Sequence, residues 1–353
     1  MDATDARISR AAVIGPGRIG RQIALAFALG GGEALLVDVK ARPERDAHVA
    51  LADARREIAR DLALMAEERV ITEGDAAATL RRIEDRIGLG DLMDYGFIQE
   101  ALPESAELKR QLFRHLADVV APDAIIASTS STISPSDLMD AVDRPERFLV
   151  AHWLNPAHVI PLVEVVPSPR TAPATVTRTL ALLERLGKVP VRCGDSPGFI
   201  GPRLQVLLMN EAVRLVEEGV ATPEDVDKAF RAGMGFRYAS VGIFEFIDWG
   251  GVDVLYRASC YMAEATNDAR FAPAALVTAK MRANELGPKT GRGFFDYAGE
   301  RRETFETAKL RALLRQVKRE REATPRESAS SGERALPRES GSARDGASLP
   351  ESV

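Results

Sequence analysis

The first half of the chain alternates short apolar runs with helical stretches. Residues 8–14 form an apolar run that leads into a glycine turn, the run at 21–29 has helical character, and residues 34–38 form a second short apolar run. This order of strand, glycine-rich turn, helix and strand predicts a βαβ unit, which begins a parallel sheet. Further buried strands are predicted at 96–99, 124–127, 147–151 and 160–166.

The hydrophobic pattern changes after about residue 197. Beyond it the apolar positions follow helical spacing, which predicts helices over 202–219, 223–233, 251–266 and 273–286. Residues 44–70, rich in Ala, Arg and Glu, predict one or two long helices within the first half. We therefore expect an α/β domain over residues 1–194 and an all-α domain over residues 195–321.

The end of the chain has a different composition. Residues 322–353 are rich in Ser, Pro, Glu, Arg and Gly, and their only large apolar residues are Leu336, Leu349 and Val353. Such a segment buries too little apolar surface to offset the entropy lost on ordering. Residues 322–353 are therefore predicted to be a disordered tail.

The overall composition narrows the possible function classes. Apolar residues make up 45% and charged residues 28% of the 353 residues, and the net charge is −5. Because no basic block stands out, a nucleic-acid-binding role is not expected. No apolar run approaches about 18 residues, so no membrane span is expected, and the polar N-terminus lacks a secretory core. The two cysteines, Cys193 and Cys260, form no CxxC pair, which favours a cytoplasmic location and no structural metal.

The glycine turn carries the first chemical signal. Residues 15–20 read G-P-G-R-I-G between a predicted strand and a predicted helix, and Asp38 ends the next strand 18 residues later. In this context the pattern predicts a dinucleotide-binding turn, in which the helix N-terminus offers its free N–H groups to a pyrophosphate. The candidate cofactor-binding residues are Gly15, Gly17, Arg18, Ile19, Gly20 and Asp38.

The acidic residue indicates which cofactor binds. Asp38 would accept hydrogen bonds from the adenosine ribose, and its charge would repel a 2′-phosphate, so NAD is favoured over NADP. Lys40 and Arg42 lie nearby and weaken that preference. The alternative is a βαβ crossover with a purely structural role. We expect a doubly wound, Rossmann-type parallel sheet that binds NAD.

A histidine and a glutamate form the second chemical signal. His152 ends the apolar run FLVAH at the carboxyl end of a predicted strand, where ligands bind in open α/β sheets. Glu164 lies within the apolar stretch IPLVEVV, so its carboxylate needs a partner such as an imidazolium. Such a pair orients a general base. The hydroxyl cluster at 128–132 follows another strand and would bind a reacting alcohol, or else it only caps a helix.

In these motifs the chain resembles the L-3-hydroxyacyl-CoA dehydrogenase family, and within it the branch that contains lambda-crystallin (L-gulonate 3-dehydrogenase). The resemblance covers about residues 8–297. It is carried by GPGRIG, EALPESAELK, STSSTISPSDL, AHWLNPAHVIPLVEVVPSP, GDSPGFI, RLVEEGVATPEDVDKA and GPKTGRGFFDY.

The resemblance implies roles for individual residues. His152 is the base, Glu164 orients it, and Ser131 binds the substrate hydroxyl. Glu104 and Lys109 lie near the nicotinamide ribose. The implied substrate contacts are Ser131, Asn155 and Arg237. The implied product is a 3-oxo compound from an L-3-hydroxyacyl substrate, as in fatty acid metabolism, and the helical domain is expected to form a homodimer.

The chain departs from the family pattern at positions that bear on the substrate. Pro202 stands where the family has an asparagine, and the helix at 53–69 lacks the lysines typical of acyl-CoA members. Arg237 would instead clamp a free carboxylate. A small 3-hydroxycarboxylate, similar to L-gulonate or carnitine, is therefore the alternative substrate. A non-catalytic, crystallin-like role and an NAD-binding interaction module are the alternatives of another class.

Overall fold

The computed structural model describes residues 8–299 and 301–323. The chain forms two compact units, divided between Arg214 and Leu215. The predicted tail lies outside the described residues, except that Glu322 and Ala323 belong to the last helix of the second unit.

The first unit is built around one sheet, whose strands in the described residues number eight. Their spatial order is β3-β2-β1-β4-β5-β6-β7-β8. Neighbouring strands are parallel except β6 and β7, which are antiparallel. The strands are β1 (Arg10–Ile14), β2 (Glu33–Asp38), β3 (Ile83–Ile87), β4 (Phe97–Glu100), β5 (Ile125–Ser128), β6 (Phe148–Trp153), β7 (Leu162–Pro167) and β8 (Val189–Arg192).

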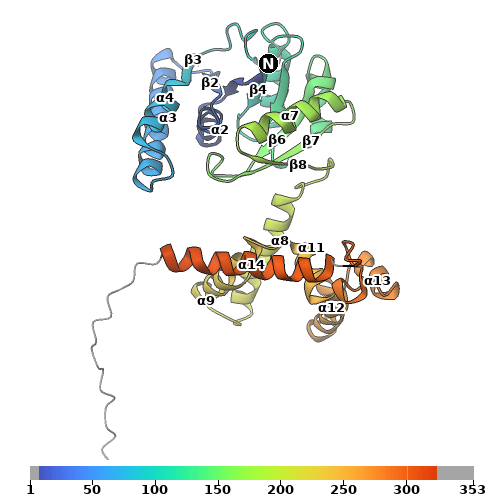
Figure 1. Ribbon diagram of the computed structural model, residues 1–353. Coiled ribbons are helices and arrows are strands. Elements are labelled where there is room, and N and C mark those ends of the chain that lie inside the picture. Colours follow the sequence, from blue (N-terminus) through green and yellow to red (C-terminus); the bar gives the residue numbers. More distant parts are fainter. Residues whose placement is uncertain (1–7, 300, 324–353) are drawn as a thin grey trace, which may run out of the picture. The chain divides into compact units, whose positions relative to one another are not determined.

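Helices cover both faces of this sheet (Figure 1). Alternate residues of β1 point to opposite faces, so Ala11 and Val13 join one apolar cluster and Ala12 and Ile14 join the other. The first face packs against α2 (Arg18–Leu29), α3 (Glu44–Glu67), α4 (Glu73–Arg81) and α7 (Pro173–Arg185). The second packs against α5 (Ala106–Leu116) and α6 (Pro135–Leu138). The predicted doubly wound α/β fold is confirmed.

The strand order locates the functional edge. The chain runs outward from β1 to β2 and β3, then returns to place β4 on the other side of β1. This reversal opens a crevice at the carboxyl ends of β1 and β4, where ligands of open α/β sheets bind.

The sequence pattern did not predict the two strands at the edges of the sheet. β3 reads IEDRI and exposes most of its side chains, so it lacks the apolar run that marks a buried strand. β8 contains Pro190, and a proline argues against an interior strand because it cannot donate to the ladder. Both strands take their conformation from pairing with a neighbour rather than from their own composition.

The second unit is helical, as predicted. The helix α8 (Gly201–Glu217) runs across the division between the units. It is followed by α9 (Pro223–Phe230), a π-helical turn (Arg231–Gly235), α10 (Phe236–Tyr238), α11 (Ile243–Gly250), α12 (Val252–Thr266), α13 (Ala275–Arg282) and α14 (Arg301–Ala323). Within residues 8–299 and 301–323, every helix is too short or too polar to span a lipid bilayer.

A buried carboxylate fixes the last loop of this unit. Asp248 on α11 is 1% exposed and accepts hydrogen bonds from the backbone N–H groups of Phe294 and Phe295 and from the Tyr297 hydroxyl. Burial and the negative charge of Asp248 raise the pKa of Tyr297 well above its ordinary value, so the hydroxyl keeps its proton and donates.

We expect Phe27→Ala to lower the free energy of unfolding of the first unit by about 3–5 kcal/mol, measured by denaturant titration. The Phe27 ring is fully buried and contacts the rings of Phe97 and Trp153, with centroids at 5.6 and 6.1 Å. Leu64→Ala, at a position of α3 that is 55% exposed, is the control and should change stability by under about 0.5 kcal/mol. Equal losses in the two variants would contradict this description of the core.

Candidate functional site

The glycine turn after β1 is shaped to admit a ligand backbone. Gly15 has φ +116°, a conformation that disfavours other residues, and a Cβ on Gly20 would lie 1.9 Å from the Gly15 carbonyl oxygen. A Cβ on Gly17 would meet no atom within 4 Å, so this glycine faces open space. α2 begins at Arg18 without a side-chain cap, and its first N–H groups have no intrahelical partner.

A cavity of about 610 Å³ opens in front of this turn. The glycine turn, Asp38 and residues 101–103 after β4 line it. Asp38 is 2% exposed and accepts hydrogen bonds through Oδ1 from the Lys40 backbone N–H and from Arg42. Open space at Gly17, free helix N–H groups and a carboxylate at the end of β2 fit the pyrophosphate and adenosine ribose of NAD.

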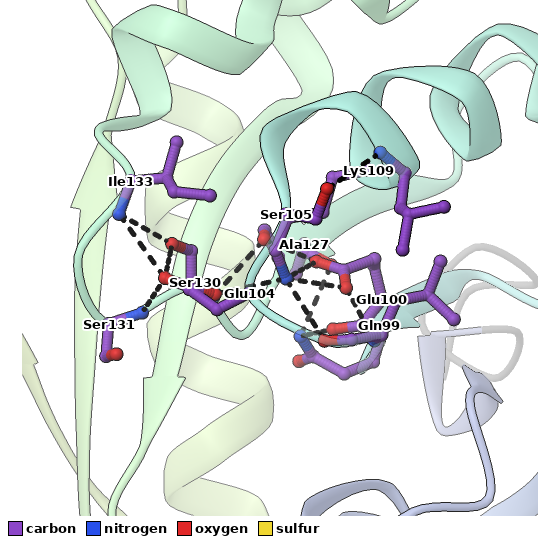
Figure 2. A network of polar contacts seen from close by, with 12 residues as sticks. Gln99, Glu100, Glu104, Ser105, Lys109, Ala127, Ser130, Ser131 and Ile133 are labelled. Carbon is purple, nitrogen blue, oxygen red and sulfur yellow. Dashed lines mark hydrogen bonds and ion pairs between the residues drawn. The ribbon is translucent and has the colours of Figure 1, made fainter.

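Glu104 holds the loop that follows β5, as Figure 2 shows. Its Oε1 accepts hydrogen bonds, at 2.5 to 3.4 Å, from the hydroxyls of Ser130 and Thr132 and from the backbone N–H groups of Ser131, Thr132 and Ile133. Burial would raise the pKa of Glu104, but these donors and the Lys109 ammonium outweigh burial and lower the pKa to about 2. The backbone of Ser131 is therefore fixed, while its own hydroxyl bonds to nothing in the described part of the chain.

Glu100 is a site residue that the sequence reasoning missed. It ends β4, is fully buried, and accepts two hydrogen bonds from the Lys109 ammonium, at 2.7 and 2.8 Å. It also accepts from the Ser128 hydroxyl at 2.5 Å and from the Leu102 backbone N–H at 2.6 Å. Lys109 reaches Glu104 as well, at 3.4 Å, so one ammonium joins the two carboxylates (Figure 2). His152 was selected because it is a polar residue at the carboxyl end of a predicted buried strand. The same criterion applied to Glu100 would have identified it.

His152 and Glu164 meet across β6 and β7, which are antiparallel neighbours in the sheet. Their Cα atoms are direct partners in the β6–β7 register, and Nδ1 of His152 lies 2.8 Å from Oε2 of Glu164. Glu164 is fully buried and His152 is 9% exposed. An ionised carboxylate can only accept, so Nδ1 donates to Glu164 and the lone pair of the neutral ring is on Nε2.

The second oxygen of Glu164 is bound by the start of α8. Oε1 accepts from the backbone N–H groups of Ile200 and Gly201 at 2.9 and 2.7 Å. Burial would raise the pKa of Glu164, but the hydrogen bonds from His152, Gly201 and Ile200 outweigh it and hold the pKa below its ordinary value. Pro202, the next residue, has no N–H and suits the first turn of a helix.

The buried thiol of Cys193 lies beside the same carboxylate. Its Sγ is 3.9 Å from Oε1 of Glu164. Burial and the negative charge of Glu164 raise the pKa of Cys193 to about 11, so the thiol stays protonated near neutral pH. The cysteine therefore adds a weak donor to the surroundings of Glu164 and no second charge.

A buried lysine holds the loop that carries Asn155. Asn155 follows β6, is exposed, and precedes Pro156 through a cis peptide bond. The Lys188 ammonium donates to the carbonyl oxygens of Ala157, His158 and Ile160, at 2.7 to 3.3 Å. Burial lowers the pKa of Lys188 to about 8. No sequence pattern pointed to Lys188, because its partners are backbone carbonyls about 30 residues away.

The carboxyl edge of the sheet thus gathers most of the predicted site residues. The glycine turn follows β1, Asp38 ends β2, Ser131 follows β5 and His152 lies on β6. Arg237 belongs to the second unit, where its guanidinium stacks on the Phe246 ring at 4.1 Å. The roles predicted for these residues toward cofactor and substrate stay predictions.

Comparison with known proteins identifies the family to which the chain belongs. Residues 10–196 match the family described as 3-hydroxyacyl-CoA dehydrogenase, NAD binding domain, and residues 198–297 match its C-terminal domain. The chain is 35% identical over 292 residues to a 3-hydroxybutyryl-CoA dehydrogenase of Bradyrhizobium diazoefficiens, covering 83% of this chain and 96% of that protein. It is 41% identical over 239 residues to the lambda-crystallin homolog of Bos taurus, covering 66% and 72%. A solved 3-hydroxyacyl-CoA dehydrogenase from Archaeoglobus fulgidus has a TM-score of 0.69 and 32% identity, covering 88% and 99%.

We expect Glu104→Gln to lower the melting temperature in a pH-dependent way. The pKa of Glu104 falls from 4.5 to about 2 on folding, so its carboxylate stabilises the folded chain above pH 4.5 and loses this effect as the pH falls toward 2. The difference from wild type should therefore be largest above about pH 5 and shrink below it. Thermal melts over this range test the expectation, with Glu107→Gln on α5 as the surface control. A difference that does not change with pH would refute the assigned role.

Proposed function

Since this chain belongs to the 3-hydroxyacyl-CoA dehydrogenase family and is an NAD-dependent oxidoreductase that acts on CH–OH groups, we propose that it oxidises an L-3-hydroxyacyl-CoA thioester to the 3-oxo thioester, with His152 as the base. The observation that carries this proposal is the hydrogen bond of 2.8 Å between His152 Nδ1 and Glu164 Oε2.

The His152–Glu164 pair is suited to removing a hydroxyl proton. Glu164 keeps the proton of the ring on Nδ1, so Nε2 presents a lone pair to the substrate alcohol. When Nε2 takes the hydroxyl proton, the imidazolium that forms is stabilised by the buried carboxylate. Bound NAD supplies the acceptor for the hydride that leaves C3.

Ser131 is proposed to hold the substrate oxygen. Glu104 fixes its backbone, and its hydroxyl makes no hydrogen bond with any residue that the structure describes. β5 and β6 are neighbours, with Ser128 paired to Val150, so the Ser131 loop and His152 extend from adjacent strand ends. Asn155, on the loop after β6, is proposed as a further polar contact. A hydroxyl donor on one side of the alcohol and a base on the other would orient its C3–H bond.

The setting of this reaction follows from the proposed substrate. Oxidation of 3-hydroxyacyl thioesters is a reaction of fatty acid metabolism, and we propose a cytoplasmic enzyme that forms a homodimer through its helical unit. The relative from Bradyrhizobium diazoefficiens is named for 3-hydroxybutyryl-CoA, which favours a short acyl chain.

A free 3-hydroxycarboxylate is the second candidate substrate, and the arginines support it. On α3, Arg55, Arg56 and Arg60 each pair with a nearby carboxylate, so they are less available to a CoA phosphate. Arg237 forms no ion pair within residues 8–299 and 301–323, and its guanidinium would clamp a carboxylate through two parallel hydrogen bonds. If the protein has the alternative, non-catalytic role, the His152–Glu164 pair takes no part in any reaction.

We expect NADH formation with L-3-hydroxybutyryl-CoA in a panel that also contains free L-3-hydroxybutyrate, L-gulonate and L-carnitine at equal concentrations. His152→Ala should abolish turnover, whereas His48→Ala, at an exposed position of α3, should retain it. Turnover of a free acid alone would replace the thioester by the second candidate. NAD binding without turnover of any compound would favour the non-catalytic role.

We expect Glu164→Gln to lower kcat by about 10²- to 10⁴-fold, because the amide reverses the hydrogen bond to the histidine. The glutamine oxygen would keep the N–H groups of Ile200 and Gly201, and its NH₂ group would donate to Nδ1. The ring proton would then move to Nε2, which could no longer act as a base. Steady-state kinetics with unchanged binding of NADH test this; a kcat within about threefold of wild type would remove Glu164 from the proposed mechanism.

A further inference from the structure

Unsatisfied buried polar atoms gather around the dinucleotide cavity. In the described residues, four buried side-chain atoms make no hydrogen bond, and three of them belong to residues that line this cavity: Arg21 Nε, Arg42 Nε and Asp38 Oδ2, the last of which is nevertheless ion-paired with Arg42. Buried polar groups in proteins are almost always hydrogen bonded. The charged side chains at the wall of this cavity therefore keep hydrogen-bonding capacity that the chain itself does not use.

The pairing of Asp38 with Arg42 leaves part of the guanidinium free. A single atom, Nη2 of Arg42, lies 3.0 Å from both carboxylate oxygens of Asp38. Asp38 is 1% exposed and Arg42 is 23% exposed, so the carboxylate is shielded from water while the guanidinium stays partly accessible. A guanidinium has five N–H donors on a planar frame, and the Nε edge is not used by Asp38.

This arrangement changes the usual discrimination against a 2′-phosphate. An unpaired carboxylate at the end of the second strand repels the phosphate and selects NAD. Here the charge of Asp38 is balanced by Arg42, and Lys40 also lines the cavity. The net charge of these three side chains is positive, which favours an additional anion.

We propose that Arg42 is a specificity-determining residue that enables the cavity to bind nicotinamide dinucleotides with a 2′-phosphate, of the NADP type, in addition to NAD. Nη2 of Arg42 stays on Asp38, while the partly exposed remainder of the guanidinium donates to the phosphate oxygens. Lys40, which also lines the cavity, adds a second positive charge. The ribose hydroxyls of NAD use Asp38 itself, so one pair of residues serves both cofactors. This inference concerns cofactor binding alone and does not depend on the substrate or on the role of His152.

The test is direct binding of NADH and NADPH, which differ only in the 2′-phosphate, followed by nucleotide fluorescence and by calorimetry. For the wild-type chain we expect dissociation constants within about tenfold of each other. Arg42→Met should weaken NADPH by at least about tenfold, the loss of one charge-assisted contact, and leave NADH within about threefold. Arg45→Met is the matched control, because it removes the same charge from an exposed position three residues away, and it should change neither constant.

A second variant keeps the test independent of any effect of Arg42 on folding. Asp38→Asn removes the negative charge and should shift the ratio of the two dissociation constants at least about tenfold toward NADPH. An NADPH-to-NADH ratio that stays at its wild-type value in Arg42→Met would overturn the proposal. So would a wild-type chain that binds NADH but not NADPH. Thermal melts show whether each variant is folded before binding is compared.

Discussion

A carboxylate removed from water must be surrounded by donors, and this constraint organises the carboxyl edge of the sheet. Glu100 and Glu164 are both fully buried. Glu100 takes its donors from α5, β5 and the loop after β4, and Glu164 takes its donors from β6 and the start of α8. Losing one donor would leave a buried charge partly unpaired, which costs far more than an ordinary hydrogen bond contributes. The need to satisfy these two charges therefore holds five segments in fixed positions.

The same constraint explains how two loops at this edge keep a defined conformation. The residues predicted to contact substrate, Ser131 and Asn155, both lie on loops after strands. Each loop is held by one charged side chain. The Glu104 carboxylate accepts hydrogen bonds from N–H and O–H groups of the Ser131 loop, and the Lys188 ammonium donates to carbonyl oxygens of the Asn155 loop. The anion Glu104 therefore binds backbone N–H groups, and the cation Lys188 binds backbone carbonyl groups. In both cases a charged side chain fixes backbone that has no regular secondary structure.

Local sequence patterns predicted those features of the fold and the site that depend on residues close together in the sequence. The glycine turn, Asp38, the buried strands and the pairing of His152 with Glu164 follow from spacing, burial and the position of polar residues at strand ends. Glu100 carried the same signal, whereas Lys188 and the amides that bind Glu164 carried none, because their partners are distant backbone groups. The edge strands β3 and β8 were missed for a related reason, since pairing with a neighbour determines them more than composition does. Residues 324–353 of the predicted tail lie outside the described residues.

The composition of those edge strands affects the tendency of the chain to aggregate at high concentration. An open sheet ends in two rows of unpaired backbone groups, which are templates for strands of other molecules. β3 presents Glu84, Asp85 and Arg86 along one edge, and β8 has Pro190 in the other, where an N–H is missing. Charges and proline at these positions oppose edge-to-edge pairing, so the two least strand-like segments of the sheet are also its protection against aggregation.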